Sequence, residues 1–193
     1  MIRPSDTPFK AVSLIPNSVG LFKRYGIKPS ENCTHIDSIA KTHGIDQDFL
    51  VQLINSSYVF DSVTGHEFTE HSITVLLDYL ERSHKFYLDV YLPEIDQTIE
   101  QLRVSSGSSS GAFKLLQVFF RSYKLDLKRH IQYEEKFLIP YAKILNSANQ
   151  YKMAFPSLVP MTNFYSVQEF LDNHSHHEVE LRDVRKALRN YTP

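Results

Sequence analysis

A long amphipathic stripe between residues 112 and 145 constrains the fold more than any other feature of this sequence. Its members are spaced alternately three and four residues apart, which is the pattern of a helix that packs against partner helices along one seam. The seam consists of Phe113, Leu116, Phe120, Tyr123, Leu127, His130, Glu134, Phe137 and Tyr141. Such a helix needs further helices to cover its stripe, so the sequence predicts an all-α bundle.

Two other stretches carry comparable stripes. Residues 67–102 predict a long helix that Pro93 should kink near Leu92. Residues 163–190 predict another long helix. A Ser/Gly-rich connection at 105–111 joins the first two long helices and makes them antiparallel neighbours. We therefore expect an antiparallel bundle of three long helices.

The first third of the chain has a different character, with short helical runs separated by turn residues. The runs at 18–25 and 36–43 are each followed by a glycine, and a third run covers 46–58. Helices of this length are marginal in isolation, so they must pack on one another. We expect a small helical N-terminal domain at 1–62 and a bundle domain at 63–193.

Polar side chains interrupt all three stripes at positions where core residues belong. His84 interrupts the first stripe, His130 and Glu134 the second, and His174 the third. His130 and Glu134 are four residues apart, so they project from one face on adjacent turns. His84 and His130 lie equally far from residue 107. In an antiparallel pair of helices, the two histidines should therefore lie at the same height along the bundle. A register error of two residues would separate their heights by only about 3 Å.

Burying a carboxylate and several imidazoles inside an apolar bundle costs free energy unless they are paired or bind a cation. Glu and His at this spacing on facing helices are the recurrent frame of di-iron sites, and these ligands suit iron, zinc or manganese. Any one of these interruptions could equally be a hydrogen-bonded core histidine or a surface helix pair. Their coincidence on three seams favours a metal site. The candidate ligands are His84, His130, Glu134 and His174, and it stays open whether His177 or Glu178 also binds.

The overall charge and the single cysteine exclude several other classes of protein. The chain has 21 Lys and Arg against 22 Asp and Glu, which gives no strong field for nucleic acid or an anionic membrane. Cys33 stands alone, so there is no disulfide framework and no thiolate cluster. No run of 18 apolar residues and no signal-like N-terminus is present, so we expect a cytoplasmic protein.

At the candidate ligands the sequence resembles the repair-of-iron-centres family of hemerythrin-like di-iron proteins. RHIQYEEKFLIPY at 129–141 is similar to the family's HxxxEExxLFP motif. YLERSHKFYLDVYLPEI at 79–95 resembles its first ligand helix, and FLDNHSHHEVEL at 170–181 its third. SVGLFKRYGI at 18–27 and THIDSIAKTHGID at 34–46 resemble the small helical domain that precedes the bundle.

The resemblance implies a non-haem di-iron site that uses His84, His130, Glu134 and His174. It implies nitric oxide, oxygen or peroxide as the small ligand at the metal. The function would be the repair of iron–sulfur centres or the response to nitric oxide and oxidative stress, with iron–sulfur proteins as partners. The alternative is an oxygen- or nitric-oxide-sensing input domain of a regulatory protein. No residue is assigned a catalytic role, and the resemblance does not decide whether the protein is an enzyme.

The chain departs from the family pattern in three places. The family carries a Cys-Cys pair after Gly-Ile where this chain reads KPSENC, so we predict no catalytic role for Cys33. VSSGSSSG at 104–111 replaces a further histidine. The family's fourth bundle helix, with its own HxxxE, has no counterpart before Pro193. We therefore expect incomplete metal binding and an exposed apolar groove that includes Phe120, Leu127 and Leu181. Either a homodimer or a further helix beyond Pro193 would cover this groove.

Overall fold

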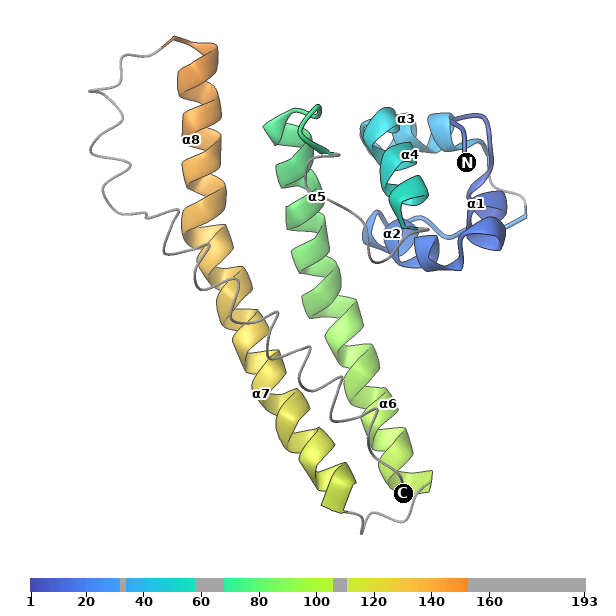
Figure 1. The fold of residues 1–193 in the computed structure, drawn as a ribbon, viewed down its shortest axis with the longest axis vertical. Helices are drawn as coiled ribbons and strands as arrows, with labels where there is room; N and C mark the ends of the chain where they lie inside the picture. Colours follow the sequence, from blue (N-terminus) through green and yellow to red (C-terminus); the bar gives the residue numbers. More distant parts are fainter. Residues whose placement is uncertain (32–33, 58–67, 106–110, 153–193) are drawn as a thin grey trace. The chain divides into compact units, whose positions relative to one another are not determined.

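The structure is a computed structural model and is drawn as a ribbon in Figure 1. It describes residues 1–31, 34–57, 68–105 and 111–152. Every regular element within these ranges is a helix, so the predicted all-α fold is confirmed for them. The chain divides into two compact units, Met1–Glu135 and Lys136–Pro193. The expected domain boundary at residues 62 and 63 lies outside the described residues, as does the predicted helix at 163–190.

Four short α-helices and one 3-10 turn make up the N-terminal part of the first unit. They are α1 (Pro8–Leu14), η1 (Pro16–Ser18), α2 (Val19–Arg24), α3 (Ile36–His43) and α4 (Gln47–Ser56). Helix α1 was not predicted, although its start signal is present in the sequence. The Thr7 hydroxyl accepts a hydrogen bond from the backbone N–H of Lys10 at 3.2 Å, and Pro8 occupies the first helical position.

The predicted glycine stops are confirmed at both helices. Gly44 ends α3 in the left-handed conformation, with φ 63° and ψ 35°, and its N–H bonds back to the last turn. Gly26 follows α2 with φ 69°. The next helix begins at Asp46, whose carboxylate accepts a hydrogen bond from the backbone N–H of Phe49 at 2.8 Å.

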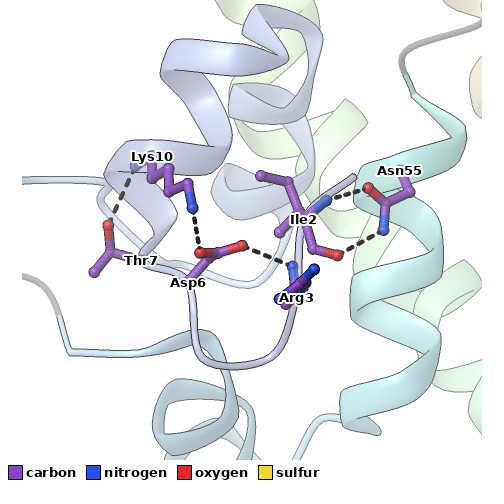
Figure 2. Close-up of polar contacts among 6 residues, drawn as sticks. All are labelled: Ile2, Arg3, Asp6, Thr7, Lys10 and Asn55. Carbon is purple, nitrogen blue, oxygen red and sulfur yellow. Dashed lines mark hydrogen bonds and ion pairs between the residues drawn. The ribbon is translucent and has the colours of Figure 1, made fainter.

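The short helices share one apolar core. Its largest fully buried side chains are Phe22, Ile36, Phe49, Leu50 and Ile54. The N-terminal segment is fastened to this core by a pair of hydrogen bonds between Ile2 and Asn55, shown in Figure 2. The Asn55 side chain accepts from Ile2 N–H at 2.7 Å and donates to Ile2 C=O at 3.0 Å.

The first long helical stretch consists of α5 (Ile73–Phe86), the π-helical turn η3 (Tyr87–Tyr91) and α6 (Leu92–Ser105). The first turns of α5 pack on the N-terminal core through Val75, Leu76 and Tyr79. The helix begins later than predicted, at a cap made by the Ser72 hydroxyl. The distortion expected at Pro93 takes the form of the π turn, in which Leu92 N–H bonds to Tyr87 C=O five residues back.

The second stretch consists of α7 (Gly111–Tyr133), the π-helical turn η4 (Glu134–Leu138) and α8 (Ile139–Gln150). It is helical five residues beyond the predicted end at 145. Lys124 on α7 and Asp96 on α6 form an ion pair at 2.6 Å. His84 on α5 contacts Glu134. Residue 84 thus pairs with residue 134, and residue 96 pairs with residue 124. The two helical stretches therefore run antiparallel, as predicted.

An apolar cluster joins α6 and α7. Its buried members are Leu92, Ile99 and Phe120, and Leu127 packs half-buried against them. The expectation that Phe120 is exposed is therefore wrong, because α6 covers it and leaves 7% of its surface accessible. None of the helices in the described ranges combines the length and apolar character needed to cross a membrane.

Candidate metal centre

Three of the four predicted ligands meet around one carboxylate. His84 lies near the end of α5, His130 in the last turn of α7, and Glu134 at the start of η4. The distance from His84 Nε2 to Glu134 Oε2 is 2.8 Å, and that from His130 Nε2 to Glu134 Oε1 is 3.2 Å. Each oxygen of Glu134 therefore faces a different imidazole.

The site is almost closed to solvent. Only 3% of His84 and 5% of Glu134 is exposed, and the His130 side chain is 22% exposed. Burial alone would raise the pKa of Glu134, but hydrogen bonds from His130 and His84 outweigh it and lower that pKa to about 2. The carboxylate is thus ionised at neutral pH and offers its charge to both imidazoles.

His84 has a second contact that the seam analysis missed. Its Nδ1 lies 3.3 Å from Glu135 Oε1, yet it is buried and makes no hydrogen bond to any of the described residues. Glu135 is one residue off the seam and half exposed, so heptad spacing gave no reason to select it. The signal in the sequence is the Glu-Glu pair at 134–135, of which only Glu134 falls on the seam. One imidazole therefore lies between two carboxylates.

The predicted heights need one correction. His84 was expected to lie level with His130, but the atom it contacts belongs to Glu134, one turn further along. Helical side chains lean toward the N-terminus of their own helix. In an antiparallel pair, this tilt carries the His84 imidazole toward higher residue numbers on α7. His174, His177 and Glu178 lie outside the described residues.

The donor atoms fit a metal site in part. When two donor atoms each lie about 2.1 Å from one metal ion and subtend a right angle at it, the distance between the two donor atoms is about 3 Å. The two imidazole–carboxylate distances, 2.8 and 3.2 Å, lie on either side of that value. In the described part of the chain, no group of three or more His, Cys, Asp or Glu side chains could hold a metal ion. The described residues offer two ligand pairs that share Glu134, instead of one group of three.

Comparisons of the chain with protein-family models, with curated proteins and with solved structures found no match. The resemblance to the hemerythrin-like family therefore rests on the motifs in the sequence.

Proposed function

We propose that the chain is a non-haem iron protein of the hemerythrin-like type, acting in the repair of iron–sulfur centres or in the response to nitric oxide and oxidative stress. One observation carries the metal proposal: a buried, ionised carboxylate whose two oxygens face imidazoles from two different helices. A carboxylate in that position is suited to bridge two cations. The repair and stress roles, and a cytoplasmic location, come from the sequence resemblance and composition.

Each described residue has a distinct part in this proposal. Glu134 would hold the metal through its carboxylate, and His84 and His130 would be its imidazole ligands. The resemblance implies His174, which lies outside the described residues, as a further ligand. These residues would leave open coordination positions on a bound iron for a small ligand such as nitric oxide, oxygen or peroxide. The low exposure of His84 and Glu134 excludes bulk water from the bound carboxylate.

The test is an anaerobic titration of the purified chain with Fe²⁺, followed by measurement of iron per chain and of the optical spectrum after nitric oxide is added. We expect the iron content to fall by at least about tenfold in His84→Ala and His130→Ala. His43→Ala is the matched control, because this exposed histidine on α3 has no place in the site.

The outcomes separate iron binding from a purely structural role. Iron uptake with a nitric oxide spectrum that both site variants abolish supports the proposal. Equal uptake by the wild type and by His84→Ala contradicts it. In that case the three side chains are a buried ion-paired cluster that holds α5 against the start of η4.

A further inference from the structure

Arg24, at the end of α2, reaches across to the helix that carries His84. Its guanidinium lies over the rings of Tyr79, Phe86 and Tyr87, at 5.5, 5.9 and 5.3 Å from their centroids. It also donates hydrogen bonds to two phenol oxygens, Tyr79 Oη and Tyr87 Oη, the second at 2.9 Å. One cation from the N-terminal helices is thus held by three aromatic side chains on either side of His84 in sequence.

We call Tyr79, Phe86 and Tyr87 the aromatic cage. Within the described part of the chain, the guanidinium of Arg24 makes its contacts with these three side chains. Its Nε is buried and has no hydrogen-bond partner among the described residues, and an unpaired buried donor costs free energy. The neighbouring residue behaves differently. Lys23 is exposed and forms only a surface ion pair with Glu94 at 3.3 Å.

Two of the three caging rings lie across the helix from His84, whereas Tyr87 is three residues after His84 and about 60° from it, on the same side. At about 100° per residue, Tyr79 and Phe86 project from the side of α5 roughly opposite His84. They are seven residues apart, so a group that contacts both fixes the rotation and the axial position of the helix. With side chains about 5–6 Å from the axis, a rotation of about 20° moves the imidazole by about 2 Å. That shift exceeds what the 2.8 Å contact with Glu134 tolerates.

We propose that Arg24 is a positioning residue for His84, through which the N-terminal helices set the geometry of the candidate metal centre. Further contacts along the same interface support this. Tyr25 packs against Tyr79 with ring centroids 6.3 Å apart, and the Arg82 guanidinium lies 5.4 Å from the Tyr25 ring. The N-terminal helices are therefore a structural part of the centre. This inference rests on the proposed function where it treats His84 as a ligand.

The test compares three variants of the full chain: Arg24→Met, Arg24→Lys and the control Lys23→Met. The first readout is hydrogen exchange of the backbone amides at 79–87 in the metal-free chain. The second is the Co²⁺ affinity and absorption spectrum of the chelator-treated chain. Far-UV circular dichroism establishes that each variant is folded.

In Arg24→Met we expect exchange at 79–87 to rise by at least about tenfold and Co²⁺ affinity to fall by about tenfold. Arg24→Lys should be intermediate, because an ammonium keeps the charge over the rings but lacks the planar fork that serves both phenols. Lys23→Met should match the wild type. If Arg24→Met does not fold, Tyr87→Phe replaces it, since it removes one acceptor and keeps the ring, and its exchange should rise by a smaller factor.

The two readouts also distinguish this inference from the proposed function. If the wild type binds no Co²⁺, the metal proposal fails, and the exchange data alone decide whether Arg24 positions the helix. If a folded Arg24→Met shows the exchange and Co²⁺ affinity of Lys23→Met, the role of Arg24 is overturned and the metal proposal is untouched. A loss of Co²⁺ affinity with unchanged exchange at 79–87 also contradicts positioning through the helix.

Discussion

Replacing Glu134 by Gln keeps the volume of the side chain and removes its charge. The two imidazoles face different oxygens of Glu134, and Gln puts an NH2 group in place of one of them, so in this geometry it can accept from one imidazole but not from both. The size of the effect follows from the pKa of Glu134, which lies at about 2 in the fold against an ordinary value of 4.5. At about 1.4 kcal/mol per pKa unit, the ionised carboxylate contributes about 3 kcal/mol to folding at neutral pH.

The pH dependence of this contribution has a definite sign. A carboxyl group whose pKa is lowered by folding stabilises the protein fully above its unfolded pKa, near 4.5, and loses that contribution as the pH falls toward 2. Urea denaturation of the metal-free chain should therefore find Glu134→Gln less stable than wild type by about 3 kcal/mol at pH 7. The difference should shrink between pH 4.5 and 2 and vanish below that range.

The matched control is Glu135→Gln, which removes the same charge one residue away. Half of the Glu135 side chain is exposed, so this change should cost less than about 1 kcal/mol. A Glu134→Gln variant as stable as the wild type at pH 7 would show that the charge of Glu134 does not stabilise the fold. A stability difference that persists unchanged at pH 2 would show the same, because the loss would then come from packing and not from charge.

Three further changes test other parts of the account. Phe120→Ala should lower the free energy of unfolding in urea by about 3 kcal/mol, because Phe120 is buried between α6 and α7. The control is Val118→Ala, at a position 68% exposed, which should change the free energy of unfolding by less than about 0.5 kcal/mol. Gly44→Ala should lower thermal stability by about 1 kcal/mol, since φ is 63° there, while Gly20→Ala, inside α2 with open space around it, should raise it. Cys33→Ser should leave the iron content unchanged, because the sequence has no second cysteine to pair with this thiol. A large loss of iron would assign the thiol a role.

Features governed by local chemistry were the easiest to predict from the sequence. The end of α3 at Gly44 and the start of α4 at Asp46 each depend on a few adjacent residues, and both were found where the sequence placed them. The long seam at 113–141 likewise predicted the second helical stretch, because apolar periodicity reports directly which face is covered. Helix α1 was missed because its single turn signal at Thr7 is not followed by a long periodic stripe.

Features that depend on contacts distant in sequence were harder to predict. The sequence indicated His84, His130 and Glu134 as interruptions of apolar seams, but it did not indicate that Glu134 lies between the two histidines. That arrangement depends on the tilt of the side chains and on the register of the two helices. Counting residues from the connection between the helices predicts only the heights of the Cα atoms. The contacts of Arg24 with Tyr79 on α5 and Tyr87 on η3 join residues 55 and 63 positions apart and leave no periodic signal.

The most direct test of the central claim is the X-ray absorption spectrum of iron bound to the full chain. The account predicts imidazole scattering in the wild type and an iron–iron distance of about 3.5–4 Å, as expected for two ions bridged by Glu134. Both features should be lost or much weakened in Glu134→Gln and retained in Glu135→Gln. Iron with only oxygen neighbours, no imidazole scattering and no change in Glu134→Gln would contradict the claim.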